Sequence, residues 1–203
     1  SQVHTVANNK NQADIYQGYR FKHNGNVKDK VTLYLMNEIF GGSMSSRLFT
    51  DLRESRQLAY GVSSNIDYTD DVGIMSLHIE TTTENHETGE KSFDNIKKSI
   101  DGFNENINRM VTEKVSDEEL ANAKKRMKTS MLSMAETTKG KNFILSKSVT
   151  TPYGINSQNE MLAMIDSITA DDVLNAARYV FSGKPVYSLT ATQDSIDAKL
   201  LEI

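Results

Sequence analysis

The sequence contains no cysteine and no tryptophan, and only two of its 203 residues are proline. Without cysteine the chain forms neither a disulfide nor a thiolate metal site, although this absence does not identify a compartment. No stretch approaches the roughly 18 consecutive apolar residues that a membrane-spanning helix needs. The formal net charge of −4 argues against a nucleic-acid-binding protein, which shows a basic face. A length of 203 residues fits one large domain or two small ones.

The spacing of apolar residues predicts the order of helices and strands. Alternation of apolar and polar residues indicates a strand, whereas a repeat of three or four residues indicates a helix. The predicted strands span residues 13–21, 62–68, 72–82 and 186–192, and the predicted helices span residues 28–40, 47–54, 93–110, 116–134, 141–149, 157–165 and 169–180. This order predicts a single α+β domain over residues 12–203, a mostly antiparallel sheet with helices packed over it. Residues 1–11 are polar and aperiodic, which predicts a linker or tail.

Local signals mark the ends of these elements. Turns are predicted at residues 24–25, 70–71 and 151–154, and capping boxes at residues 116–119 and 169–172. Three methionines, Met127, Met131 and Met134, recur at helical spacing after the first capping box. At this spacing methionine is more often part of a core than of an adaptable binding surface, so we expect these side chains to be buried.

The stretch over residues 41–60 contains two adjacent glycines followed by three serines and a short amphipathic segment. Gly41 and Gly42 predict the end of the preceding helix, where a left-handed residue is common. The hydroxyls of Ser43, Ser45 and Ser46 are N-cap candidates for the helix predicted over residues 47–54.

Arg53 and Tyr60 are the candidate functional side chains of this stretch. A helix, a turn and a strand of this length can bring the Arg53 guanidinium and the Tyr60 hydroxyl to one rim. The pattern alone leaves a second interpretation open. Arg53 lies among charged neighbours (Asp51, Glu54 and Arg56), which also fits a solvated helix end with weak surface pairs, and Tyr60 is then an ordinary strand tyrosine.

The series G-G-S-M-S-S-R-L-F-x-x-L-R-E-x-x-x-L-A-Y over residues 41–60 resembles the signature of the second half-domain of pitrilysin-type zinc peptidases. This family includes insulin-degrading enzyme and the mitochondrial processing peptidase. Two later segments, S-D-E-E-L-x-x-A-K and I-T-A-D-D-V, are similar to later helices of the family, so the resemblance covers the chain from about residue 12 onward. It implies a half-domain of the same α+β architecture.

The resemblance also implies roles for individual residues. In the family, the arginine and tyrosine of L-R-E…L-A-Y bind the substrate backbone and help to stabilise the tetrahedral intermediate, and these roles fall on Arg53 and Tyr60. Gly41, Gly42 and Ser43 belong to the loop that borders the substrate chamber. One residue departs from the pattern, because Gln57 stands where the family usually has glycine. If that position needs a positive φ, Gln57 is strained and the direction of Tyr60 changes.

The implied partners are a peptide substrate and an N-terminal half that carries the zinc ion, either on the same parent chain or on a separate subunit. In the family, zinc binds to H-x-x-E-H, and a zinc-bound hydroxide attacks the peptide carbonyl. None of the four histidines here, His4, His23, His78 and His86, pairs with another at that spacing. We therefore expect zinc in the parent enzyme, none bound by this chain, and no cleavage by this chain alone.

Other catalytic motifs do not fit the sequence. The glycines at 41–42 lack the downstream Gly-Lys-Ser/Thr of a phosphate-binding loop, and no serine lies in a G-x-S-x-G elbow. Adjacent turn carboxylates such as Asp70 and Asp71 are mostly solvated rather than an acid–base pair.

Two alternatives to the zinc-peptidase hypothesis stay open. The first is a non-catalytic structural or peptide-binding subunit of the same family, and the second is an unrelated α+β module. The presence of both Arg53 and Tyr60 favours the enzyme, because a purely structural descendant has no chemical reason to keep them. The sequence shows no signal peptide and begins with Ser1 rather than methionine, which suggests an excised or processed fragment. The peptides cut and the compartment, whether cytoplasm, periplasm or organelle, are left undetermined.

Overall fold

The computed structural model describes residues 2–7, 11–23, 25–68, 71–85, 88–90, 92–150 and 156–191, without the side chains of residues 2–7 and 150. The strands are β1 (Gln2–Ala7), β2 (Gln12–Lys22), β3 (Ala59–Tyr68), β4 (Val72–Thr82) and β5 (Val186–Ala191). The helices are α1 (Val27–Phe40), α2 (Asp94–Thr112), α3 (Asp117–Glu136), α4 (Thr138–Thr150), α5 (Ser157–Ile165) and α6 (Ala170–Val180), with a short π-helix, η1 (Phe49–Ser55). None of the described helices is long and apolar enough to cross a membrane.

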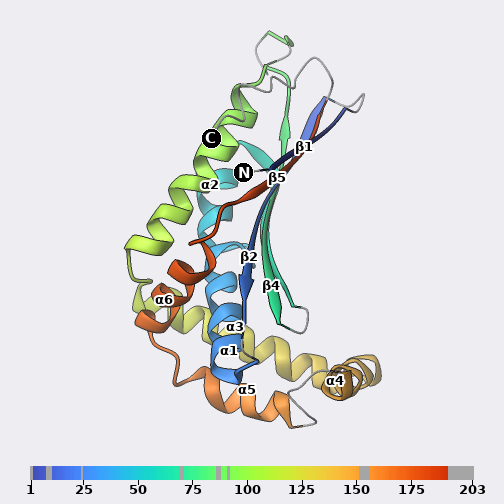
Figure 1. Ribbon diagram of the computed structural model, residues 1–203, viewed down its shortest axis with the longest axis vertical. Helices are drawn as coiled ribbons and strands as arrows, with labels where there is room; N and C mark the ends of the chain where they lie inside the picture. Colours follow the sequence, from blue (N-terminus) through green and yellow to red (C-terminus); the bar gives the residue numbers. More distant parts are fainter. Residues whose placement is uncertain are drawn as a thin grey trace.

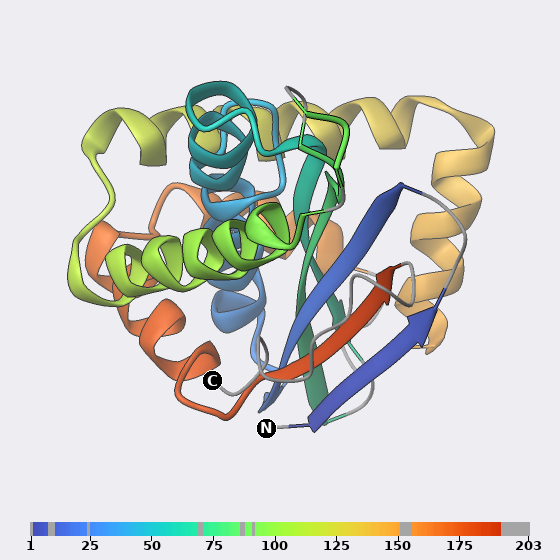
Figure 2. The ribbon, with the colours of Figure 1, turned by 90° about the horizontal axis from the view of Figure 1, so that it is seen from above.

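The strands form one five-stranded sheet in the order β1-β5-β2-β4-β3. Neighbouring strands are antiparallel except β1, which lies parallel to β5. Helices α1, α2 and α6 pack on one face of the sheet, and α3 and α5 lie against α1 (Figure 1). The view from above shows the same layer of helices beside the sheet, with α4 at the far end of α3 (Figure 2). The fold class is therefore α+β with a mostly antiparallel sheet, as predicted.

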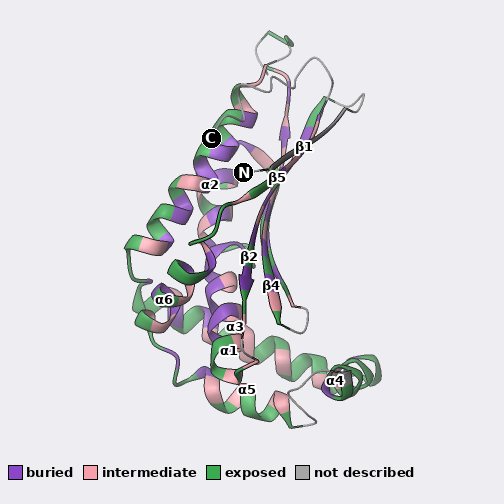
Figure 3. Ribbon diagram, viewed as in Figure 1, coloured by how far each residue is buried: buried purple, intermediate pink, exposed green. Residues whose placement is uncertain are grey.

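The core lies between the sheet and this helical layer (Figure 3). Every second residue of β2 and β4 is buried, as the alternation predicts. The apolar residues of α2 that step by three and four form its buried side, namely Ile96, Ile100, Phe103, Ile107 and Met110. Both predicted capping boxes are present. Ser116 and Glu119 start α3, and Thr169 and Asp172 start α6, each pair exchanging side-chain and backbone hydrogen bonds.

The structure differs from the sequence prediction at the N-terminus. Residues 2–7, expected to belong to a tail, form β1 instead. Its partner is the last strand, with Gln2 opposite Val186 and Ala7 opposite Ala191. A polar sequence without a period gives no local sign of such pairing, because the hydrogen bonds come from the opposite end of the chain.

The methionines of α3 are less buried than predicted. Met127 and Met131 are half-buried against the core, but Met134 is exposed. The fully buried residues of α3, Leu120 and Ala123, lie in its first two turns. The prediction of a core role was therefore wrong for Met134. Of the predicted turns, Asn24, Asp70 and residues 151–154 lie outside the described residues, whereas Gly25 has the positive φ of 72° expected of a turn glycine.

Candidate functional site

Gly41 and Gly42 end α1 and hold the following loop against β3. Their two amides donate hydrogen bonds to the carbonyl oxygen of Asn37 at 2.9 and 2.8 Å, and the Gly41 carbonyl accepts one from the Ser64 amide at 3.0 Å. A Cβ atom on Gly41 would lie 2.7 Å from the Ser64 nitrogen, which is too close for any side chain. The prediction of a left-handed residue was wrong, since Gly41 has φ −155° and Gly42 is not among the positive-φ glycines. Close approach, not φ, requires glycine at 41.

The three serines do not cap the following helix. The Ser43 hydroxyl donates backwards to the carbonyl oxygen of Glu38 at 3.1 Å, and η1 has no side-chain hydrogen bond at its N-cap. The Ser46 side chain is buried, and its hydroxyl has no hydrogen-bond partner among the described residues. The N-cap prediction was therefore wrong, although Ser43 does fix the loop to the end of α1.

The helix predicted over residues 47–54 is mainly a π-helix. Its backbone amides donate hydrogen bonds to carbonyl oxygens five residues earlier, as in the 2.9 Å hydrogen bond from the Arg56 amide to the Asp51 carbonyl. This spacing inserts one extra residue per turn and is frequent at functional sites. The inner side of η1 packs on α2, where Leu52 is buried and lies so close to Gly102 that a Cβ atom there would clash with it.

Two clusters of ion pairs hold η1 in place. Arg56 donates two hydrogen bonds of 2.9 Å to Asp51 and one to Glu105 on α2, and these carboxylates raise the pKa of the guanidinium. On the other side, the guanidinium of Arg47 donates to both carboxylate oxygens of Glu119 at 2.7 and 3.0 Å. The hydrogen bonds from Arg47 lower the pKa of Glu119 to about 2. The start of η1 is thereby tied to the start of α3.

The chain leaves η1 through Gln57, which has φ 52°. A left-handed conformation is uncommon for a residue other than glycine, asparagine or aspartate. The sequence predicted strain at Gln57 only if its position has a positive φ, and the structure confirms that it does. The turn is fixed on both sides. The Leu58 amide donates to the Leu52 carbonyl at 2.9 Å, and the Leu58 carbonyl accepts from the Thr81 hydroxyl at 2.6 Å.

Tyr60 lies at a β-bulge at the start of β3. Ala59 pairs with Thr81 and Gly61 pairs with the adjacent Glu80, so Tyr60 has no partner in the ladder. A bulge inserts one residue and redirects the side chains around it. The Tyr60 side chain is 85% exposed, and β3 is an edge strand of the sheet. The phenol is therefore open to a ligand that approaches the edge of the sheet.

Arg53 and Tyr60 lie side by side. The guanidinium carbon of Arg53 is 5.7 Å from the centroid of the Tyr60 ring and 4.6 Å from that of Phe49, within the range of cation–π contacts. Arg53 is half-buried and forms no ion pair with a carboxylate of the described residues. In contrast, its neighbour Arg56 is fully engaged by Asp51 and Glu105. Of the arginines in η1 and at its end, Arg53 is the one whose donors are open to a ligand.

The Arg53–Tyr60 pair presents hydrogen-bond donors at one rim. A guanidinium has five N–H donors and no acceptor, and a phenol donates its O–H. Such a pair suits an electron-rich oxygen, either a peptide carbonyl or the oxyanion that forms from it. The structure thus brings together two predicted site residues, with the loop of Gly41, Gly42 and Ser43 fixed beside the same strand by the Gly41–Ser64 hydrogen bond. The roles of all five residues stay predictions.

The described part of the chain contains no group of three or more His, Asp or Glu side chains that fits a metal ion. His78 lies on the sheet, 3.2 Å from Asp14 and stacked on Tyr16 with ring centroids 4.3 Å apart. The side chain of His4 and all of His86 lie outside the description. These donor sets do not fit zinc, which needs three protein ligands and an open position in a catalytic site.

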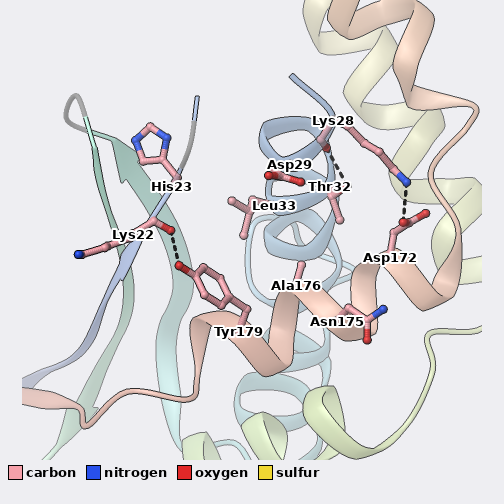
Figure 4. Close-up of a pocket in the computed structure, with 10 residues that line it drawn as sticks. All are labelled: Lys22, His23, Lys28, Asp29, Thr32, Leu33, Asp172, Asn175, Ala176 and Tyr179. Carbon is pink, nitrogen blue, oxygen red and sulfur yellow. Dashed lines mark hydrogen bonds and ion pairs between the residues drawn. The ribbon is translucent and has the colours of Figure 1, made fainter. Parts of the chain in front are cut away.

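A separate pocket of about 610 Å³ lies at the opposite end of the sheet (Figure 4). It is lined by residues from the end of β2, the start of α1 and α6: Lys22, His23, Lys28, Asp29, Thr32, Leu33, Asp172, Asn175, Ala176 and Tyr179. Lys22 is paired with Val72, at the end of β4 away from Glu80 and Tyr60. An ion pair of 2.8 Å between Lys28 and Asp172 crosses its rim. Sequence analysis missed this pocket, because its walls come from segments far apart in the chain.

The fold and this rim define a class of protein: an α+β domain that presents an arginine of a π-helix and a tyrosine of an edge strand side by side, with no fitting metal site among its described residues. A sequence profile of the peptidase M16 inactive domain matches residues 1–127. The chain therefore belongs to the peptidase M16 inactive-domain family, and the resemblance to pitrilysin-type zinc peptidases is confirmed.

One relative supports this assignment, and two solved structures share the fold. An uncharacterised zinc protease of Rickettsia felis is 30% identical over 83% of this chain and 38% of its own length. A protease from Helicobacter pylori has a similar fold, with a TM-score of 0.77 at 14% identity over 93% of this chain and 43% of its own. A peptidase M16 inactive domain from Pseudomonas fluorescens gives a TM-score of 0.72 at 18% identity over 95% of this chain and 43% of its own. The chain thus spans less than half the length of these relatives.

Proposed function

We propose that this domain is the half of a zinc metalloendopeptidase that binds the substrate and stabilises the transition state without holding the zinc. A zinc-bearing half, on the same parent chain or on another subunit, supplies H-x-x-E-H and the activated water. The observation that carries the proposal is the contact between Arg53, which has no carboxylate partner among the described residues, and the exposed Tyr60 of the edge strand. The family supports it, since the R. felis relative is named a zinc protease.

Arg53 and Tyr60 have different tasks in this proposal. The Arg53 guanidinium, steadied by the Phe49 ring, holds a carbonyl oxygen of the substrate backbone. The Tyr60 hydroxyl donates a hydrogen bond to the oxyanion that develops on the scissile carbonyl. Removing one donor of this kind lowers kcat by about 10²- to 10³-fold in other hydrolases. The loop of Gly41, Gly42 and Ser43 borders the bound peptide.

The geometry is held by the protein before any substrate arrives. The π-helix sets the direction of Arg53, the left-handed Gln57 turns the chain, and the bulge turns Tyr60 outward. Donors that are fixed in advance need no reorganisation during the reaction, which is the main source of electrostatic catalysis. This is the physical reason to keep a strained Gln57 and an irregular helix in one short stretch.

The test is peptidase activity of the full-length parent, or of this chain with its zinc-bearing half, comparing wild type with Tyr60→Phe. We expect zinc-dependent cleavage whose kcat falls about 10²-fold or more, with zinc content and circular dichroism unchanged. The matched control is Tyr16→Phe, a half-exposed tyrosine of β2 outside the rim. Equal activity of wild type and Tyr60→Phe makes Tyr60 a wall residue of the chamber. No cleavage by any zinc-loaded assembly makes the domain a non-catalytic structural or peptide-binding subunit.

A further inference from the structure

Exposed apolar side chains gather at the end of the domain farthest from α2. We use the name α3–α4 hairpin for residues 132–149, which comprise the last turn of α3 and nearly all of α4. Five of its large apolar side chains are exposed: Leu132, Met134, Phe143, Leu145 and Val149, the last of them 81% exposed. In Figure 3 α4 is exposed over most of its length. Single exposed apolar residues are ordinary, but a cluster of this size indicates an interaction surface.

Few residues of the hairpin are buried. Gly140 is buried, and a Cβ atom on it would clash with the carbonyl of Met134, so the start of α4 lies directly against the end of α3. Ser148, a little over two turns later in α4, is also buried. Phe143 and Leu145 point about 200° apart at 100° per residue, and both are exposed. A helix that is apolar on several sides belongs to the interior of a larger protein.

The hairpin and the helix before it carry positive charge although the whole chain has a net charge of −4. Residues 124–150 contain seven lysines and arginines and a single acidic residue, Glu136, and two of these cations, Arg126 and Lys128, are paired with carboxylates outside this range. Two of these lysines, Lys139 and Lys141, are exposed and have no carboxylate partner among the described residues. A partner surface that complements the hairpin is therefore apolar at its centre and has Asp and Glu side chains at its rim.

The relatives provide an occupant of sufficient size. This chain covers only 38% of the R. felis zinc protease, so most of that protein is a further part outside the region compared here. We propose that the α3–α4 hairpin docks onto the zinc-bearing half of the parent, through an apolar surface with an acidic rim. The identity of this partner rests on the proposed function, whereas the inference that a partner covers the hairpin rests on its exposed apolar side chains.

Two other occupants fit the hairpin less well. A second copy of this chain would place two basic hairpins against each other, and like charges oppose such contact. A lipid surface favours a helix with one apolar face and one charged face. In α4 the exposed apolar residues Phe143 and Leu145 point in nearly opposite directions, so a flat surface cannot cover both.

The experiment is site-specific photo-crosslinking in the full-length parent, with Phe143→p-benzoylphenylalanine. We expect crosslinks within one polypeptide or one complex, mapped by mass spectrometry to the zinc-bearing half, at several times the yield of the control. The control is Tyr179→p-benzoylphenylalanine, since Tyr179 is aromatic and equally exposed, at 53% against 52%, but lies on α6. Lys141→Glu in the Phe143 variant should lower the yield, whereas Lys98→Glu, an exposed lysine of α2, should not.

Each other outcome overturns the inference. Crosslinks between copies of this domain indicate a homodimer, crosslinks to phosphatidylglycerol vesicles added to the sample indicate a membrane surface, and a yield no higher than at Tyr179 means that nothing covers the hairpin. The readout does not depend on catalysis. If the crosslinks form but Tyr60→Phe leaves cleavage unchanged, the docking surface is supported and the proposed role of Tyr60 is refuted. If no crosslinks form but Tyr60→Phe lowers cleavage, the role of Tyr60 is supported and the docking surface is refuted.

Discussion

Arg53 lies against Tyr60, with the guanidinium carbon 5.7 Å from the ring centroid, although the two residues belong to different elements, η1 and β3. Each element contains one irregularity that adds a residue. In η1 it is the π-helical turn that contains Arg53, and in β3 it is the bulge at Tyr60. Irregularities of both kinds change the direction of the side chains around them and are frequent at functional sites. The juxtaposition of these donors is the basis of the first prediction.

Arg53 and Tyr60 should act as a coupled pair in the parent enzyme. Arg53→Lys loses the planar fork of donors, so we expect kcat/KM to fall about tenfold or more, since a hydrogen bond to a charged group contributes about 1.5–3 kcal/mol. In the double variant with Tyr60→Phe, the loss should be smaller than the product of the single losses, because both donors serve one bound peptide. Steady-state kinetics measure the cycle, with Arg109→Lys, an exposed arginine of α2, as control. Strictly multiplicative losses would argue against a shared ligand.

Gln57 should be one of the few positions where glycine does not destabilise the domain. Relief of a left-handed residue gains about 1 kcal/mol, and the greater freedom of glycine in the unfolded chain offsets about 0.5–1 kcal/mol of it. Gln57→Gly should therefore leave the free energy of unfolding equal or slightly raised, whereas Gln57→Val should lower it by more than 1 kcal/mol, because a β-branched residue tolerates φ 52° poorly. Urea denaturation measures both, and a loss of stability in the glycine variant refutes the strain at Gln57.

Substitution by alanine should destabilise the domain at Gly41 but not at Gly61. A Cβ atom on Gly41 meets the backbone of Ser64 at 2.7 Å, whereas one on Gly61 has no atom within 4 Å. Overpacking of this kind costs about 1–3 kcal/mol, so Gly41→Ala should lower the free energy of unfolding by about 2 kcal/mol. Gly61→Ala should change it by less than about 0.5 kcal/mol. Thermal or urea unfolding gives the comparison, and equal effects of the two substitutions would contradict the close contact of loop and strand.

Acid should weaken the contact between Arg47 and Glu119. The pKa of Glu119 is lowered to about 2 in the folded protein, so its contribution to stability is complete at neutral pH and is lost as pH falls from about 5 towards 2. Because the carboxylate is one-third exposed, we expect a loss of about 1 kcal/mol after screening by solvent. Unfolding in urea at several pH values should show a shallower acid dependence for Glu119→Gln, which keeps the capping box.

The control for this measurement is Glu118→Gln, an exposed neighbour in the same turn of α3. It should retain the acid dependence of the wild type. An unchanged pH profile in Glu119→Gln would show that other carboxylates govern the acid sensitivity.

Features that depend on neighbouring residues in the chain were predictable. The apolar side of α2 and the capping boxes at Ser116 and Thr169 need only contacts within one helix or one turn, and all were confirmed. Strands β2 and β4 followed from alternation, because one face of each is buried. The positive φ at Gln57 could be stated as a condition, since a glycine was expected there from resemblance.

Features that depend on distant contacts were not predictable. The strand β1 needs β5 as its partner, from the other end of the chain. An α-helix and a π-helix have similar local preferences, so the apolar spacing of residues 47–54 did not distinguish them. In the structure Leu52 of η1 lies against Gly102 of α2, a contact between residues far apart in the chain. Met134 has the spacing of a core residue, but α3 extends past the body of the domain at that point.

The sequence by itself determined the α+β order of elements, the family and the identity of Arg53 and Tyr60 as candidates, because periodicity, capping and a contiguous motif are all local properties. Only the tertiary structure decided that the two side chains meet at one rim and that the α3–α4 hairpin is left uncovered. Both facts depend on how elements pack, and packing is a sum of contacts between residues that are far apart in the chain.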